Sequence, residues 1–236
     1  DRKQDGALQA WESAMAVRDT ALDLSKDFYE KELEQVILAQ GITTRDEYRV
    51  ARRTGREGIL GRAKRDAVWP VFEEYRGQLS SRKLKEVDDA YREVASMLSS
   101  GEARRPAYSA ILIDETQDFG EQALKLLRAM IEPGANDLFF VGDGHQRIYS
   151  RNKAAMSKCG IDIRGRARKL YLNYRTTDEI RKQAVALLEG CEVDDLDGGQ
   201  DETQRYKSLS HGPVPSVYPV EGLEAAAAQA IRQYVG

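Results

Sequence analysis

Three carboxylates lie within the five residues that follow an apolar run of the sequence. The run 110–113 (Ala-Ile-Leu-Ile) leads into Asp114, Glu115 and Asp118. Such a run is typical of a buried strand in a parallel sheet, and ligands of open α/β sheets bind beyond the carboxyl ends of the strands. Adjacent acids at that point could face a metal-bound phosphate. The alternative is a helix start, with Asp118 as N-cap and Glu121 as its capping-box partner.

Two further polar clusters follow predicted strands. The strand 137–141 ends in the segment 142–149 (Gly-Asp-Gly-His-Gln-Arg-Ile-Tyr), and the strand 169–174 ends in Asn-Tyr-Arg at 173–175. If the sheet is parallel, these ends converge with the acids at one edge. The combined set holds two adjacent carboxylates, a glutamine, an arginine and aromatic rings.

This set suits the hydrolysis of a nucleoside triphosphate. Mg²⁺ keeps most of its waters and takes one or two carboxylates, so one acid would hold the ion and the other would orient or deprotonate the attacking water. A glutamine would sense the γ-phosphate, and an arginine would stabilise the charge that develops on the transferred group. A metal-dependent nuclease or phosphatase built on Asp114, Glu115 and Asp118 is a further alternative. It lacks a nearby Lys or His to complete its site, and it leaves the glutamine and the arginine unexplained.

The first hundred residues are predicted to form helices. An apolar stripe at mixed spacings of three and four predicts a helix over 7–39. Thr44 and Glu47 form a capping box, which opens a helix that runs to Arg53. Two more helices are predicted over 62–77 and 82–99.

The pattern then changes to an alternation of strands and helices, which predicts a parallel α/β sheet. The strands are expected over 107–113, 137–141 and 169–174. A helix is expected over 120–131, and Thr177 is expected to cap another over 178–188. An acidic loop, a strand and an Ala-rich helix are predicted over 189–211, 214–220 and 221–235.

The composition, with 41% hydrophobic and 32% charged residues, fits a soluble globular protein with a core. No apolar run approaches the ~18 residues of a membrane span, and the charged start at 1–5 is no signal peptide. Cys159 and Cys191 have neither zinc nor disulfide-framework spacing. We therefore expect a reduced, cytoplasmic compartment.

Charge is unevenly distributed along the chain, although the net charge is only −3. Residues 150–169 carry seven basic residues and one acid, whereas 189–202 carry seven acids and no base. Such asymmetry indicates binding partners rather than a fold. The stretch 45–65, with eight basic residues and three acids, is either a solvated helical face or a surface for phosphates.

Three motifs in order resemble a known family. Ile-Asp-Glu-Thr-Gln-Asp at 113–118, Val-Gly-Asp-x-x-Gln-x-Ile-Tyr at 141–149 and Leu-Asn-Tyr-Arg-Thr-Thr at 172–177 resemble motifs II, III and IV of the UvrD/Rep superfamily 1 DNA helicases. Each motif alone is only moderately specific for the family, but the three in this order and spacing are a strong signal for it.

The resemblance implies an α/β fold of partial RecA-like P-loop NTPase domains, each a parallel sheet with flanking helices, plus an all-helical insertion. By position, residues 1–104 would be the helical insertion of the first RecA-like domain. Residues 105–167 would be the C-terminal part of that domain, and 168–236 the start of the second.

The resemblance also implies roles for individual residues. Asp114 and Glu115 would form the metal side of an ATP site, with Asp114 holding Mg²⁺ through water and Glu115 acting as catalytic base. Gln146 would contact the γ-phosphate and the attacking water. Arg175 would be an arginine finger, and Tyr174 would stack on the adenine.

On the DNA side, Tyr149 would lie against a base of the single strand, where stacking contributes ~1–3 kcal/mol per base. The family's usual Trp-Arg-Gly-Ala is replaced here by the segment 151–154, Arg-Asn-Lys-Ala, so that a stacking Trp is missing. Arg151 and Lys153 would substitute with salt-sensitive phosphate contacts.

The implied function is an ATP-dependent helicase or translocase that moves 3′ to 5′ on single-stranded DNA or at duplex junctions, in repair or recombination. The sequence contains no Gly-x-x-x-x-Gly-Lys-Ser/Thr phosphate loop and no motifs V and VI. We therefore expect an internal fragment of a longer helicase, inactive when isolated. The alternative is a degenerate helicase-fold binding module without ATPase activity.

Overall fold

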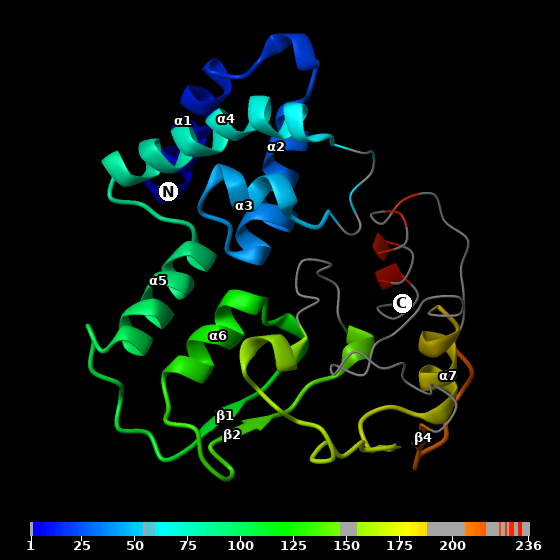
Figure 1. Cartoon of the computed structure of the whole chain (residues 1–236). Helices are drawn as coiled ribbons and strands as arrows, with labels where there is room; N and C mark the ends of the chain where they lie inside the picture. Colours follow the sequence, from blue (N-terminus) through cyan, green and yellow to red (C-terminus); the bar gives the residue numbers. More distant parts are fainter. Residues whose placement is uncertain are drawn as a thin grey trace. The chain divides into compact units, whose positions relative to one another are not determined.

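The computed structural model describes residues 2–53, 60–146, 155–187 and 206–215, with single residues at 56 and 58 and between 222 and 232. The chain divides into two compact units (Figure 1). The first comprises residues 1–165 with 194–199, and the second comprises 166–193 with 200–236.

The first unit begins with a helical part. Its elements are α1 (Arg2–Ala16), α2 (Lys26–Glu32) with a π-helix at Leu33–Leu38, α3 (Arg45–Val50) and α4 (Arg62–Ser81), followed by α5 (Val87–Ser100). These helices confirm that the first hundred residues are mainly helical.

The single helix predicted over 7–39 is wrong, because local side chains interrupt it. The Asp19 side chain accepts a hydrogen bond from the Ala21 amide, and Asp23 adopts the left-handed conformation with φ 48°. Ser25 then caps α2 by accepting from the Phe28 amide at 3.2 Å. Short polar side chains that bond to nearby backbone compete with helix formation, and here they separate α1 from α2.

The capping box predicted for α3 is confirmed. The Thr44 hydroxyl accepts from the Glu47 amide at 3.3 Å, and the Glu47 carboxylate accepts from the Thr44 amide at 3.0 Å. The helix ends at Val50 rather than at Arg53. Its last carbonyls are satisfied by Arg65, which donates to three of them, those of residues 48, 49 and 51.

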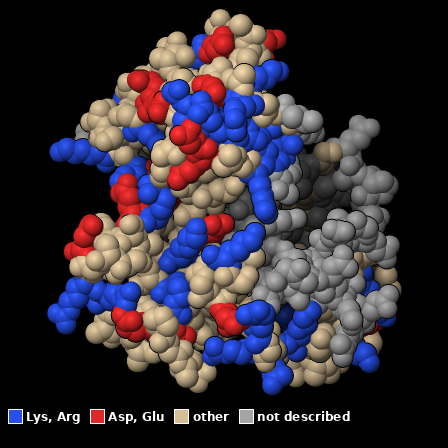
Figure 2. Space-filling model, in the orientation of Figure 1, with Lys and Arg blue, Asp and Glu red and all other residues tan. Residues whose placement is uncertain are grey.

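Half of the basic residues in the stretch 45–65 turn inward, and the other half are exposed. Glu32 is fully buried and pairs with the guanidinium groups of Arg53 and Arg56 at 2.8 and 3.2 Å. Arg49 pairs with Asp66 at 2.6 Å. Four of the eight basic residues, Arg65 included, therefore bond within the fold. Figure 2 shows Lys and Arg interspersed with Asp and Glu on the visible face of this part.

An aromatic core surrounds this charged cluster. Its rings come from α1, α2, α3 and α4, and Trp11 stacks on Tyr75 with 4.2 Å between ring centroids. The Tyr48 hydroxyl donates to Glu32 at 2.9 Å. Burial alone would raise the pKa of Glu32, but hydrogen bonds from Arg53 and Tyr48 outweigh it and hold the pKa below its usual value. The buried carboxylate is therefore ionised.

The rest of the first unit is a strand–helix–strand arrangement. β1 (Ile111–Ile113) runs parallel to β2 (Leu138–Phe140), in register from the pair Ile111 and Leu138, and α6 (Glu121–Ala129) connects them. In Figure 1, α5 lies beside α6, and Ala95, Leu98 and Ala129 pack between them. The parallel pairing predicted from the sequence is confirmed.

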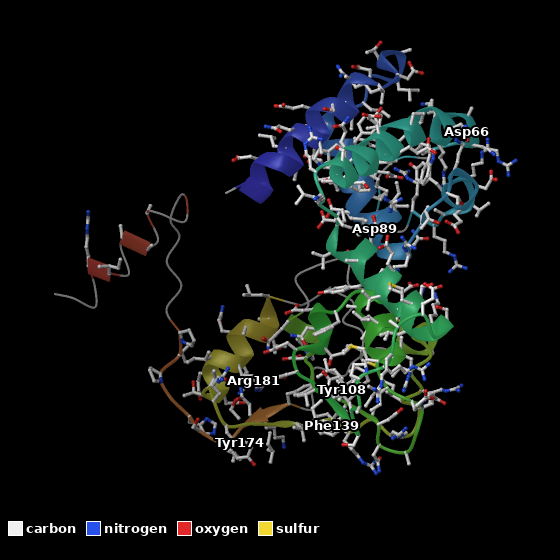
Figure 3. The ribbon with its side chains drawn as sticks, turned by 90° about the vertical axis from the view of Figure 1, so that its left-hand side faces the viewer. Asp66, Asp89, Tyr108, Phe139, Tyr174 and Arg181 are labelled. Carbon is white, nitrogen blue, oxygen red and sulfur yellow. The ribbon has the colours of Figure 1, made fainter. Side chains whose placement is uncertain are left out.

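The prediction that these strands are buried is wrong for one of their faces. Ile113 is buried, but Leu112 is 74% exposed and Phe139 is 60% exposed. Alternate residues of a strand point to opposite faces, and among the described residues only one face is covered. Figure 3 shows Phe139 and Tyr108 on this pair of strands and the segment before it.

The second unit has a smaller parallel pair, β3 (Leu172–Asn173) with β4 (Lys207–Ser208), and the helix α7 (Asp178–Ala186). The Thr177 cap on α7 is confirmed, since its hydroxyl accepts from the Ile180 amide. β4 lies within the predicted loop 189–211, which corrects that prediction. It is held there because its neighbour Asp178 bonds to the backbone at 208 and 210.

The last predicted elements are mostly outside the described residues. Val214 and Pro215 are not in a strand, and the remainder of the strand predicted over 214–220 is not described. Most of the helix predicted over 221–235 also lies outside. Among the helices that the structure does describe, none is both long and apolar enough to cross a membrane.

Candidate active site

The first two acids lie directly after β1, on a turn of unusual backbone geometry. Glu115 adopts the left-handed conformation, with φ 52° and ψ 42°, and its amide donates to the Asp114 carboxylate at 2.9 Å. A non-glycine residue in this region costs roughly 1–3 kcal/mol and is common at functional sites. Both side chains are exposed. The turn therefore holds two adjacent carboxylates open to solvent at the strand end.

The alternative reading of this stretch as a capped helix start is wrong. Asp118 lies in the 3-10 turn Thr116–Asp118, and the N-cap of α6 is Gly120, without a side-chain capping bond. The acids thus belong to the strand end and its turn.

The end of β1 is tied to the end of β2. The Thr116 amide and hydroxyl both donate to the Val141 carbonyl, at 2.9 and 2.7 Å. Gln117 is buried, donates to the Glu115 carboxylate at 2.6 Å, and accepts from the Asp143 amide at 2.9 Å. The two motif segments therefore form one hydrogen-bonded edge.

The segment after β2 is organised by Asp143. Its carboxylate accepts from the His145 amide at 3.0 Å and from the side-chain amide of Gln146 at 2.9 Å. The Gln146 backbone amide donates to the Asp143 carbonyl at 3.1 Å, which closes a short 3-10 turn. Gln146 is exposed and oriented by these bonds.

Sequence reasoning identified Asp114, Glu115 and Gln146, which the structure brings to one edge of the first unit, but it missed Gln117 and Asp143. Asp143 had a signal, because Asp near the start of a turn bonds to the backbone two residues on. Gln117 had none, because its role depends on a contact with a residue 26 positions away.

The donor set of this edge is compatible with Mg²⁺ bound together with a phosphate. Among the described residues no group of three or more His, Cys, Asp or Glu side chains could hold a metal ion. Asp114 and Glu115 could still provide one or two ligands, with waters and phosphate oxygens completing the shell, as Mg²⁺ prefers. The two carboxylates could therefore share Mg²⁺ with a phosphate ligand.

The third motif lies in the second unit and forms an Asx turn. The Asn173 side chain accepts from the Arg175 amide at 2.8 Å and donates to the Thr176 hydroxyl at 2.6 Å. Tyr174 is 76% exposed, and Figure 3 shows it at the β3 end. The Arg175 guanidinium is exposed and has no carboxylate partner among the described residues. Both side chains are thus presented to solvent by a fixed turn.

The start of α7 supports this turn. Asp178 is buried and accepts hydrogen bonds from Arg181 at 2.8 and 2.9 Å and from the Ser208 amide at 3.3 Å. Lys182, followed by Arg181 and the Ser208 amide, holds the pKa of Asp178 well below its usual range. The carboxylate thereby joins α7 to β4, while Figure 3 shows Arg181 on the helix beside it.

The predicted DNA contacts Tyr149, Arg151 and Lys153 lie outside the described residues.

The model of the UvrD/REP helicase N-terminal domain matches residues 4–159. This range includes the helical part, β1, α6, β2 and the predicted ATP-site residues Asp114, Glu115 and Gln146, and it ends before β3. No curated protein matches the chain.

Proposed function

Because the chain belongs to the family of UvrD/REP helicase N-terminal domains, we propose that it is part of an ATP-driven motor that moves on single-stranded DNA. The observation that carries the proposal is the hydrogen-bonded edge that joins Glu115 to Gln146 through Gln117 and Asp143. It places an exposed carboxylate and an exposed amide on adjacent strand ends of a parallel pair, where nucleotides bind in α/β folds.

We propose that the α/β parts are pieces of two RecA-like domains. Residues 1–104 would be a helical insertion, 105–167 the C-terminal part of the first domain, and 168–236 the start of the second. The parallel β1–α6–β2 arrangement supports the first assignment, and the parallel β3–β4 pair with α7 supports the second.

In the proposed reaction, water attacks the γ-phosphorus of ATP and the bond to the β–γ bridging oxygen breaks. The Glu115 carboxylate accepts the proton of the attacking water, and the Gln146 amide orients that water and contacts the γ-phosphate. Asp114 would hold Mg²⁺ through water, and bound Mg²⁺ supplies positive charge beside the phosphates. Arg175 would stabilise the charge on the transferred group, an effect of roughly 10³–10⁵ in rate in well-studied systems. Tyr174 would stack on the adenine.

The DNA assignments rest on the family. We propose movement 3′ to 5′ on single-stranded DNA or at a duplex junction, in repair or recombination in the cytoplasm. Tyr149 would stack on a base, and Arg151 and Lys153 would contact phosphates. DNA binding through these phosphate contacts would weaken as the salt concentration rises.

The 236 residues contain no phosphate-binding loop of the Gly-x-x-x-x-Gly-Lys-Ser/Thr type. That loop cradles the phosphates with backbone amides and a lysine. We therefore propose that the chain works as part of a longer protein, and that alone it binds ATP weakly and hydrolyses it negligibly. Robust turnover by the purified chain would contradict this.

The missing loop also favours a second candidate, a binding module with a helicase fold and no ATPase activity. The two candidates differ in their response to nucleotide. A titration of the ¹⁵N-labelled chain with Mg²⁺·ATP should move the amide signals of Asp114, Glu115 and Gln146, with a dissociation constant on the order of 1 mM or weaker. Asp114→Asn should reduce the response, and omission of Mg²⁺ should do the same. If no signal at this edge moves while single-stranded DNA still binds, the binding-module candidate replaces the motor.

A further inference from the structure

We infer that Gln117 is a positioning residue that links the Glu115 carboxylate to the segment carrying Gln146. The two groups proposed to handle the attacking water would then be held in one arrangement before any nucleotide binds. The catalytic meaning of this link rests on the proposed function. The link itself is a set of hydrogen bonds that can be tested without nucleotide.

The Gln117 side chain lies between the two segments and has only 2% of its surface exposed. Its nitrogen donates to Glu115 Oε2 at 2.6 Å, and its oxygen accepts from the Asp143 amide at 2.9 Å. The partners dictate this orientation, because a backbone amide only donates and a carboxylate only accepts. The opposite orientation would face donor with donor and acceptor with acceptor.

The chain of bonds continues to Gln146. The Asp143 amide donates to Gln117, and the Asp143 carboxylate accepts from the Gln146 side chain at 2.9 Å. Glu115 and Gln146 are both exposed, so without these bonds each long side chain would populate several rotamers. Groups fixed in advance near their working geometry lose less entropy when the substrate binds.

Gly142 leaves the space that this amide occupies. A Cβ atom at position 142 would lie 2.9 Å from Gln117 Oε1 and 3.1 Å from the Thr116 amide nitrogen. The Thr116 neighbour is backbone, fixed by its bond to the Val141 carbonyl. The end of β2 therefore approaches Gln117 this closely only with a glycine, and the amide is confined from both sides.

Hydrogen exchange at the Asp143 amide, followed by NMR in the 236-residue chain, tests the link. Gln117→Met removes both bonds at similar volume, and we expect Asp143 exchange to become roughly fivefold faster, the size of one ordinary hydrogen bond. Glu115→Ala should also accelerate it, by about twofold, although Glu115 does not bond to Asp143. The double variant should exchange no faster than Gln117→Met, because both changes break one chain of bonds.

Two variants keep the test interpretable. Gln117→Glu retains an acceptor for the Asp143 amide but, when ionised, cannot donate to Glu115, so its exchange should rise about twofold, as in Glu115→Ala, and remain slower than in Gln117→Met. If Gln117→Met fails to fold, Glu115→Ala, a change at an exposed side chain, still tests the link. Gln146→Ala removes a bond to the Asp143 carboxylate but leaves the amide bond, and should leave the rate unchanged.

Equal exchange in the wild type and Gln117→Met would overturn the inference. Acceleration in Gln117→Met with none in Glu115→Ala would also overturn it, since Gln117 would then only cap Asp143. Failure of the proposed function would appear separately, as the absence of a response to Mg²⁺·ATP.

Discussion

The carboxylates Glu32 and Glu115 lie in the same unit and differ in how they are bonded. Glu32 is fully buried and accepts four hydrogen bonds, from Tyr48, Arg53 and Arg56. Glu115 is exposed and accepts one, from the buried side chain of Gln117. Glu32 has its charge compensated within the fold and has no access to a ligand. Glu115 is oriented by a single bond and keeps its other oxygen available to water.

The basic residues show the same division. Arg53 and Arg56 come from a strongly basic stretch that would suit phosphates, yet the fold uses them to neutralise Glu32. Arg175 comes from a motif with no other base, and it is exposed on a fixed turn. Availability for chemistry therefore follows from bonding and burial rather than from the local density of charge.

The largest effect that tests this comparison is expected at Glu32. Glu32→Gln leaves two buried guanidinium groups without their counter-charge, and we expect the free energy of unfolding to fall by about 3–5 kcal/mol. Urea unfolding measures it. The matched control is Glu115→Gln, an exposed site where a change within about 0.5 kcal/mol is expected. Equal losses of unfolding free energy in Glu32→Gln and Glu115→Gln would contradict the proposed difference between a carboxylate that stabilises the fold and one that does not.

A smaller effect is expected where the two strand ends approach. Gly142→Ala places a methyl group 2.9 Å from Gln117 Oε1 and 3.1 Å from backbone, so we expect a loss of about 1–3 kcal/mol and faster exchange at Asp143. Gly77→Ala is the matched control, because Gly77 lies inside α4 with nothing within 4 Å of the added carbon. It should instead stabilise the protein by about 0.5–1 kcal/mol. If Gly142→Ala leaves the free energy of unfolding unchanged, the two strand ends are loosely packed against each other.

The features that the sequence predicted well are those with local signals. The Thr44 and Thr177 caps and the parallel β1–β2 pair depend on residues close in sequence or on hydrophobic patterning. The position of Asp114 and Glu115 at a strand end followed from the same patterning. Their roles in catalysis, like those of Gln146, Tyr174 and Arg175, remain predictions.

The features that were missed depend on distant contacts. The inward turn of Arg53 and Arg56 requires Glu32, 21 residues before Arg53. The strand β4 is fixed by Asp178, 30 residues before Ser208. The exposed face of β1 was missed because an apolar run of three or four residues does not show whether one face or two are covered.

Glu179 in the second unit is intermediate between Glu32 and Glu115 in its bonding, and its contribution to stability should depend on pH. The pKa of Glu179 is lowered from 4.5 to about 2 by His211 and by the Gly212 amide. Because the folded-state value is the lower one, this stabilisation is fully present above pH 4.5 and is lost as the pH falls towards about 2. Glu179→Gln should therefore lower the melting temperature read from the NMR signals of α7 at about pH 5, where an imidazole is protonated. The difference in melting temperature from the wild type should close as the pH falls through that window. Since His211 is exposed, about 1 M salt should narrow the gap as well. A gap that is constant with pH would show that the carboxylate contributes no charge-dependent stability.

The smallest effect on stability is expected at Glu115 itself. Its backbone has φ 52°, a conformation that glycine adopts without strain. Glu115→Gly should therefore change the free energy of unfolding by no more than about 1 kcal/mol, because relief of the left-handed strain offsets the loss of the part-buried hydrogen bond from Gln117. The same variant should weaken the Mg²⁺·ATP response at Gln146, since it removes the proposed base and its bond to Gln117. A clear loss of stability would mean that Glu115 is held in this conformation for the fold. If stability is retained and the Mg²⁺·ATP response is lost, the left-handed backbone at Glu115 serves nucleotide binding rather than the stability of the fold.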